Sequence, residues 1–135
     1  MRPDNSPDHR TTLRDRRVLV VEDEALVSML VEDGLLEAGA RVVGAASSVG
    51  EALRLIEGAA CEGGLSAAVL DFDLSGEAVM PVADRLAVLG VPFLFATGYG
   101  DRCDRGRHAA APTLAKPFDP ESLIALVETL ASPGG

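Results

Sequence analysis

Five short apolar runs alternate along this chain with segments in which apolar residues recur every three or four positions. Continuous runs of this length are typical of strands buried on both faces, as in a parallel sheet, whereas the longer spacing is typical of helices that bury one side. The runs cover residues 18–21, 41–46, about 66–71, 91–96 and 111–115.

Start and stop signals frame the predicted helices. The first helix carries Leu26, Val27, Leu30, Val31 and Leu35 at helical spacing. Glycines follow three of the helices and are expected to end them, at Gly39, Gly58 and Gly90.

Two of these helices also have clear starts. Ser48 and Glu51 form a capping box before the second helix, and Asp119 with Pro120 is expected to begin the last one, with Leu123, Ile124, Val127 and Leu130 as its buried stripe.

The alternation repeats a strand–helix unit five times. It predicts an α/β fold with a doubly wound, five-stranded parallel sheet of flavodoxin-like order and helices on both faces. The fourth unit is the weak one, because residues 98–108 contain three glycines and few sizeable apolar groups. A regular helix is therefore not expected there.

A chain of 135 residues with 47% hydrophobic content suits one domain. We assign that domain to residues 16–131. Residues 1–15 are polar and rich in Pro, Asp and Arg, so we expect a disordered leader, and residues 132–135 form a short tail.

Net charge narrows the choice of partner. The formal charge of −9 argues against nucleic acid or an anionic membrane, since both bind basic patches, and a protein partner is expected.

The leader lacks the apolar centre of a signal peptide, and no apolar run is long enough to cross a membrane. Cys61 and Cys103 lack metal-type spacing, so a cytoplasmic protein with free thiols is expected.

Acidic residues end two of the apolar runs. Glu22 and Asp23 follow the first run and Asp71 closes the third. Parallel strands deliver such residues to one sheet edge, where three carboxylates repel one another unless a hard cation such as Mg²⁺ shares them or one takes up a proton. Thr97 and Lys116 end the last two runs and should reach the same edge, which predicts a metal-assisted phosphate site.

The order and spacing of these residues resemble the receiver domain of two-component response regulators over roughly residues 16–131. Within it, the segment from Pro92 to Gly100 resembles the subgroup called FAT GUY receivers after its Phe-Ala-Thr and Gly-Tyr signature. The resemblance implies a single-domain response regulator.

Roles for the acidic residues follow from the resemblance. Asp71 matches the phosphoacceptor, Asp23 a direct metal ligand and Glu22 a ligand acting through metal-bound water. Asp73 lies where the family supplies a backbone carbonyl to the metal. Its side chain is then free either to face the incoming phosphoryl group or to remain a solvated loop acid.

Thr97 matches the switch hydroxyl, and Lys116, the only lysine of the chain, matches the lysine that pairs with the phosphoryl group. The chain departs from the general pattern at Thr113, where receivers usually carry an aromatic residue. Tyr99 is either a substitute signalling group or a packing residue.

The expected function is that of a phosphoacceptor response regulator. It would take a phosphoryl group from a sensor histidine kinase or phosphotransfer protein onto Asp71 with Mg²⁺ and signal to a downstream protein. It would not be an enzyme beyond self-catalysed phosphoryl transfer and autodephosphorylation. A shuttle, a phosphate sink and an allosteric regulator of its kinase are equally compatible.

Two alternatives belong to other classes. The segment from Asp71 to Gly76 resembles the nucleophile motif of haloacid-dehalogenase-type phosphatases, but in that family the nucleophile strand comes before the metal acids. A phosphorylation-independent interaction module with a dead site would lack a chemical residue, and none is missing.

Overall fold

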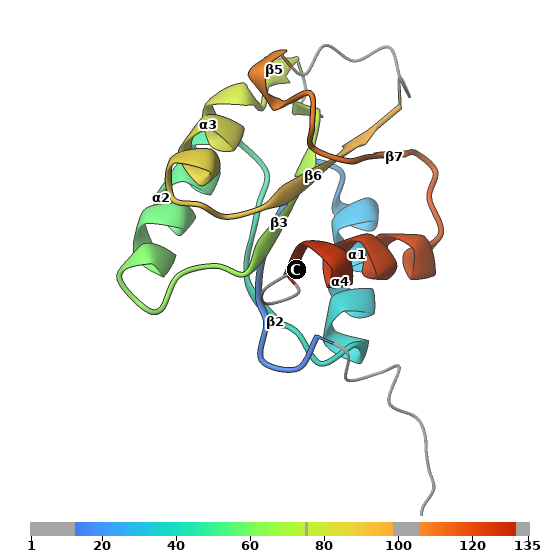
Figure 1. Cartoon of the computed structure of the whole chain (residues 1–135). Helices are drawn as coiled ribbons and strands as arrows, with labels where there is room; N and C mark the ends of the chain where they lie inside the picture. The colour runs from blue at the N-terminus through green and yellow to red at the C-terminus, as the bar shows by residue number, and fades with distance from the viewer. Residues whose placement is uncertain (1–12, 75, 99–105, 132–135) are drawn as a thin grey trace, which may run out of the picture.

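The computed structural model describes residues 13–74, 76–98 and 106–131. Five parallel strands form one sheet in the order β2-β1-β3-β6-β7, which confirms the predicted flavodoxin-like fold (Figure 1). The strands of this sheet are β1 (Arg17–Val21), β2 (Arg41–Ala46), β3 (Ala67–Asp71), β6 (Phe93–Thr97) and β7 (Thr113–Ala115). The helices are α1 (Ala25–Glu37), α2 (Val49–Ala60), α3 (Met80–Val88) and α4 (Pro120–Ala131).

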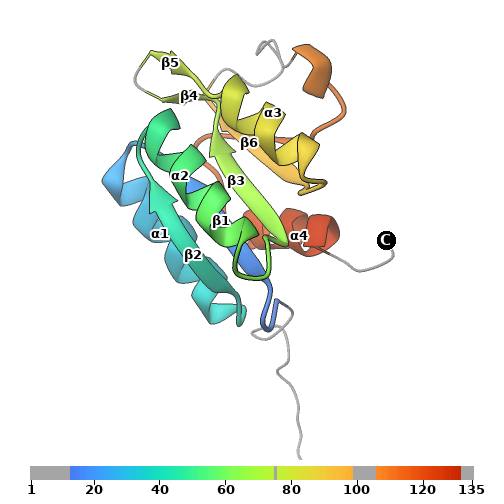
Figure 2. The same cartoon turned by 90° about the vertical axis from the view of Figure 1, so that its left-hand side faces the viewer.

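The helices cover both faces of the sheet (Figures 1 and 2). Residues of α1 and α4 belong to the core on one face, and residues of α2 and α3 to the core on the other. Alternate residues of a strand point to opposite faces. Val18 and Val20 of β1 therefore belong to the core beneath α1 and α4, whereas Leu19 and Val21 belong to the core beneath α2 and α3. Burial on both faces explains why the three central strands, β1, β3 and β6, have continuous apolar sequences.

Helix boundaries agree with most of the sequence signals. The hydroxyl oxygen of Ser48 accepts a hydrogen bond from the Glu51 N–H, as a capping box requires, while the Glu51 carboxylate accepts from the N–H of Ser47 rather than from Ser48. The expected stop at Gly58 is wrong, because α2 continues to Ala60. Glycine within a helix lowers its stability by only about 1 kcal/mol, which the packing of α2 outweighs.

The first helix differs from the expected pattern. Val31 and Leu35 are buried, but Leu26 and Leu30 are exposed even though both belong to the apolar stripe found in the sequence. The helix is apolar on more than one side, so its sequence alone does not show which side faces the sheet.

The folded part starts earlier than expected. Leu13 is buried, and its N–H donates a hydrogen bond to the carbonyl oxygen of Ala38. Residues 13–15 therefore belong to the folded unit and not to a disordered leader, because Leu13 supplies an apolar side chain to the core beneath α1 and α4. Residues 1–12 and the tail 132–135 lie outside the described residues.

A small hairpin follows β3 that the sequence did not indicate. The strands β4 (Asp73–Leu74) and β5 (Glu77–Ala78) pair antiparallel, and a carboxylate oxygen of Glu77 accepts a hydrogen bond from the N–H of Val49. This contact ties the loop after β3 to the first turn of α2. Strands of two residues are too short for a periodic pattern to reveal.

The prediction that residues 98–108 form no regular helix falls mostly on residues 99–105, which the structure does not describe. In the described part of the β6–β7 segment there is a 3₁₀ turn, Gly106–His108. The ring of His108 is buried, with its Nε2 2.7 Å from an oxygen of Asp84 in α3. Residues 99–105, which include Tyr99 and Cys103, lie outside the described part of the chain.

Candidate functional site

The site lies where the strand order reverses. The chain passes from β1 outward to β2 and then returns to β3 on the other side of β1. Ligands of open α/β sheets bind outside the carboxyl ends of the strands at such a switch point. Glu22 and Asp23 follow β1, and Asp71 ends β3, so the two strands beside the switch point supply the acids.

The three acids meet as the sequence predicts. One carboxylate oxygen from each of Glu22, Asp23 and Asp71 lies within 4.8 Å of the others. Glu22 and Asp71 are buried, with 6% and 5% of their surface exposed. Burial at the sheet edge thus holds like charges together, which disfavours ionisation of at least one of them.

Asp71 is the acid whose ionisation is disfavoured. Burial, a hydrogen bond with Asp23 and the charge of Glu22 raise the pKa of Asp71 to about 7, although the charge of Lys116 acts in the opposite direction. The position is therefore poised between a protonated acid and a nucleophilic carboxylate near neutral pH. A nearby positive charge would favour the carboxylate.

Lys116 provides part of that positive charge. It follows β7, and its Nζ lies 3.0 Å from an oxygen of Glu22 and 3.4 Å from an oxygen of Asp71. Burial by itself would lower the pKa of Lys116, but the hydrogen bonds and charges of Glu22 and Asp71 outweigh it and raise the pKa. The lysine is thus held as an ammonium group beside the candidate nucleophile.

Thr97 lies at the same edge. In the pairing of β3 with β6, Asp71 is the partner of Ala96, so Thr97 comes one residue beyond the acid. Its side chain is buried, and its carbonyl oxygen accepts a hydrogen bond from the Lys116 N–H. The backbone therefore couples the position of Thr97 to that of Lys116.

The Asp73 side chain has a local role. Its Oδ1 accepts a hydrogen bond of 2.8 Å from the N–H of Gly76, which closes the turn between β4 and β5. The Asp73 N–H in turn donates to Asp71. Of the two roles left open by the sequence, free to face the phosphoryl group or loop acid, this contact favours the loop acid. It also leaves the side chain poorly placed as the general acid that the phosphatase alternative requires.

Glu24 joins the site although the sequence analysis gave it no role. It is the N-cap residue of α1, but its side chain makes no capping hydrogen bond. One of its carboxylate oxygens instead lies 3.4 Å from Lys116 Nζ. The sequence feature that could have indicated this position is the run of three consecutive acids, from Glu22 to Glu24.

The donor set fits a hard divalent cation. Carboxylate oxygens are the ligands that Mg²⁺ uses in proteins, and one or two direct carboxylates suffice because the ion keeps several waters. Asp23 is partly exposed and one of its carboxylate oxygens lies within 4.8 Å of one from the buried Asp71, so an ion that reaches Asp23 from solvent would also lie close to Asp71. Without a cation the negative charges of these acids repel one another, as the raised pKa of Asp71 indicates.

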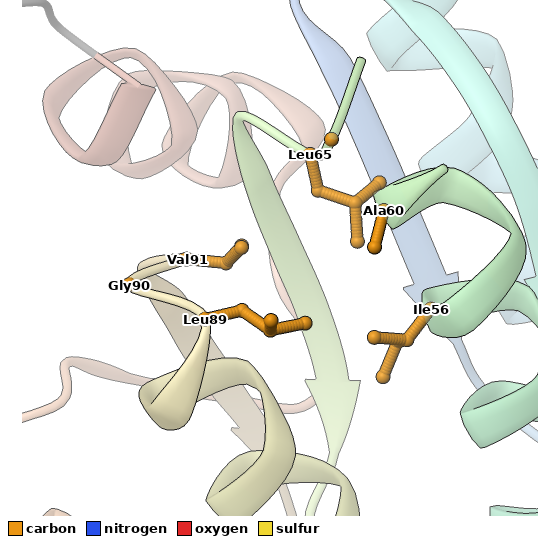
Figure 3. A pocket seen from close by; sticks show the side chains of 7 residues that line it. Ile56, Ala60, Leu65, Leu89, Gly90 and Val91 are labelled. Carbon is orange, nitrogen blue, oxygen red and sulfur yellow. The ribbon is translucent and has the colours of Figure 1, made fainter. Parts of the chain in front are cut away.

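An apolar cavity of about 240 Å³ lies at the opposite edge of the sheet (Figure 3). Leu65 and Val91 lie just before β3 and β6, so this cavity is at the amino ends of the strands, away from the carboxylates. It has no part in the phosphate site.

Among the described residues, no helix combines the length and apolar character needed to cross a membrane.

Comparison with known proteins gives a consistent family. The phyllosphere-induced regulator PhyR of Methylorubrum extorquens is 32% identical over 111 residues, which cover 82% of this chain and 41% of that protein. The chain thus spans about two fifths of the length of this curated relative. No protein-family model matches the sequence.

Solved structures agree with this finding. The solution structure of SdrG from Sphingomonas melonis Fr1 has a TM-score of 0.72 and 38% identity, covering 86% of this chain and 96% of that one. The response regulator PhyR from Brucella abortus has a TM-score of 0.71 and 26% identity, covering 90% of this chain and 50% of that one. With the fold and the acidic site, these similarities show that the chain belongs to the receiver-domain response regulators, which are signalling proteins and not classical enzymes.

Proposed function

We propose that this chain is a phosphoacceptor that receives a phosphoryl group from a phosphohistidine of a sensor kinase or phosphotransfer protein. One Asp71 carboxylate oxygen attacks the phosphorus, the N–P bond breaks, and an acyl phosphate remains on Asp71. The donor histidine leaves with the electrons of that bond. The position of Asp71 supports this role most directly, since its carboxylate is buried at the switch point beside two acids and an ammonium group.

The neighbouring residues serve this transfer. Lys116 neutralises charge on the phosphoryl oxygens, and the Thr97 hydroxyl donates a hydrogen bond to one of them. Asp23 and Asp71 would hold Mg²⁺ directly, with Glu22 acting through a bound water and the Asp73 carbonyl completing the set. When bound, the ion supplies positive charge to the transferring group.

We further propose that the chain belongs to the FAT GUY subgroup, on the segment from Pro92 to Gly100. The β7 position that usually carries an aromatic residue is Thr113, which lies opposite Phe95 in the sheet. If Thr97 moves inward, no aromatic ring on β7 can therefore rotate in response. The signal would pass through the backbone between β6 and β7 instead.

The output of the proposed phosphorylation is a change in protein binding. A solved PhyR from Bartonella quintana is described as an anti-anti-sigma factor, and the Brucella PhyR is about twice as long as the region matched here. We propose a protein partner for this chain also, in keeping with its charge of −9. The identity of that partner does not follow from the receiver fold.

Phosphorylation can be tested directly. The protein is incubated with acetyl phosphate and Mg²⁺, and intact mass is measured for the parent and for Asp71→Asn. The parent should gain the mass of one phosphoryl group and lose it in base, and the variant should gain none. Asp73→Asn, which keeps a side-chain acceptor for the Gly76 N–H, is the matched control and should be labelled like the parent.

A further inference from the structure

The hairpin of β4 and β5 links the candidate site to the start of α2 (Figure 2). Its first strand begins at Asp73, whose backbone nitrogen lies 3.3 Å from the Oδ1 of Asp71 and donates a hydrogen bond to it. Its second strand begins at Glu77, whose Oε1 accepts a hydrogen bond of 3.2 Å from the N–H of Val49. One strand of the hairpin therefore contacts the candidate nucleophile, and the other contacts α2.

The pairing of the two strands places Leu74 and Glu77 on the same face of the hairpin. These residues are directly opposite each other, and opposite residues of a ladder point to the same side. Leu74 is buried in the core beneath α2 and α3. That face is therefore turned toward α2, where burial of Leu74 and the hydrogen bond of Glu77 both hold it.

The first turn of α2 is well suited to hold a carboxylate. Its N–H groups have no acceptor within the helix, and the helix dipole places partial positive charge there. The Ser48 hydroxyl oxygen accepts the hydrogen bond from the Glu51 N–H, and Glu77 supplies an acceptor for the N–H of Val49. The Val49 side chain is buried in the same core as Leu74, so packing against the sheet fixes this turn.

Crowding of negative charge makes such an attachment important. Asp73 brings a further carboxylate to the edge that already holds the three acids of the site. Repulsion among these groups favours movement of the hairpin away from the site. The hydrogen bond from α2 to Glu77 opposes that movement, and it thereby keeps the backbone of Asp73 beside Asp71.

We propose that Glu77 is a positioning residue for the Mg²⁺ site, acting through the backbone of Asp73. The inference rests on the proposed function, in which the Asp73 carbonyl joins Asp23 and Asp71 around the ion. Without the contact between Glu77 and Val49, the hairpin has to be ordered when the ion binds, and this cost lowers the affinity. Glu77 itself does not contact the ion.

Titration with Mg²⁺ tests the proposal on the whole, isotope-labelled chain, with the amide signals of residues 22–24 and 71–73 as the readout. Glu77→Ala should raise the Mg²⁺ dissociation constant about fivefold, whereas Glu77→Gln, which keeps a side-chain oxygen as acceptor, should stay within about twofold of the parent. Labelling with acetyl phosphate should show the same difference. Glu77→Ala should need about five times more Mg²⁺ for half-maximal labelling and should approach the parent rate at saturating Mg²⁺.

Glu51→Ala is the matched control. Glu51 is an acid in the first turn of α2, and its carboxylate accepts a hydrogen bond from the N–H of Ser47 and not from the hairpin. Both alanine variants should lower the melting temperature, but only Glu77→Ala should weaken Mg²⁺ binding.

Three results would overturn the inference and leave the proposed function intact. They are an unchanged Mg²⁺ affinity in Glu77→Ala, an equal loss of affinity in Glu51→Ala, and a loss in Glu77→Gln as large as that in Glu77→Ala. Failure of the parent protein to bind Mg²⁺ would instead overturn both the inference and the proposed metal site.

Discussion

Lys116 and Glu22 are paired more closely than Lys116 and Asp71. The lysine Nζ lies 3.0 Å and 3.2 Å from the two carboxylate oxygens of Glu22 but 3.4 Å from Asp71. Glu22 therefore has its charge balanced within the protein, while the pKa of Asp71 stays raised. The buried ion pair with Glu22 holds Lys116 beside Asp71, and Asp71 does not have to serve as the main partner of the lysine.

Breaking that pair should destabilise the fold. Lys116→Gln leaves Glu22 buried without its counter-charge, and we expect a loss of about 3 kcal/mol in the free energy of unfolding, together with slower phosphorylation. The double variant Lys116→Gln with Glu22→Gln should recover most of the stability but not the phosphorylation rate. Urea unfolding measures the first quantity and acetyl phosphate labelling the second. Additive losses in the double variant would show that the two residues are not coupled.

The raised pKa of Asp71 predicts a pH dependence of stability. The folded protein keeps the Asp71 proton up to about pH 7, whereas an unfolded chain keeps it only up to about 3.8. Between these values the folded state binds more protons, so this contribution is present at low pH and is lost as pH rises. Without divalent cations, Asp71→Asn should gain stability over the parent between about pH 4 and pH 8, by on the order of 4 kcal/mol.

Urea unfolding at several pH values in a chelator tests this prediction. The difference between parent and variant is the informative quantity, because it isolates the contribution of Asp71. A difference that stays constant across the range would mean that Asp71 titrates normally.

Divalent cation should stabilise the protein through the same acids. Binding to the folded state alone adds about 2.7 kcal/mol when the Mg²⁺ concentration is 100 times the dissociation constant. Asp23→Ala should reduce the Mg²⁺-dependent rise in melting temperature and should stabilise the metal-free form, since it removes one of the crowded carboxylates. Glu62→Ala is the control. An unchanged rise in Asp23→Ala would exclude Asp23 as a principal ligand.

The hairpin turn provides a separate test of Asp73. Asp73→Ala removes the acceptor for the Gly76 N–H and should lower the free energy of unfolding by about 1 kcal/mol. Asp73→Asn keeps an acceptor oxygen and should be close to the parent in stability. If Asp73→Asn instead shortens or lengthens the phosphoryl lifetime strongly, the side chain acts on the phosphoryl group and not only in the turn.

Much of the fold was predictable because the three central strands, β1, β3 and β6, are buried on both faces. Runs such as Val18–Val21 leave a clear apolar signal, and the acids and lysine that end the runs then fall at one sheet edge whatever the details of the helices. The identity of the site residues therefore follows from strand ends, which sequence patterns locate well.

The remaining features depend on tertiary contacts. Leu26 and Leu30 match a helical stripe as well as Val31 and Leu35 do, and only packing against the sheet decides which pair is buried. Leu13 joins the core although its neighbours in sequence are polar. The contact of Glu24 with Lys116 spans 92 residues, so no local pattern could reveal it.

Phosphorylation should restrict the segment between β6 and β7. Thr97 is the last residue of β6 and Lys116 directly follows β7. Engagement of both by the phosphoryl group would draw the two strands that flank the segment toward Asp71. His108, held by Asp84 and packed edge-on against Phe93, anchors the far part of the segment to α3 and the sheet. The change should therefore concentrate between Gly98 and His108.

Hydrogen exchange with and without a phosphoryl mimic measures this change. Exchange across residues 98–108 should slow when the mimic and Mg²⁺ are bound. The internal control is β2, the outermost strand on the side of the sheet opposite β7. In Asp71→Asn no slowing is expected. Because Thr113 replaces the usual aromatic residue, the segment should respond through its backbone. Equal exchange in the two states, with partner affinity nonetheless changed by phosphorylation, would place the switch elsewhere in the molecule.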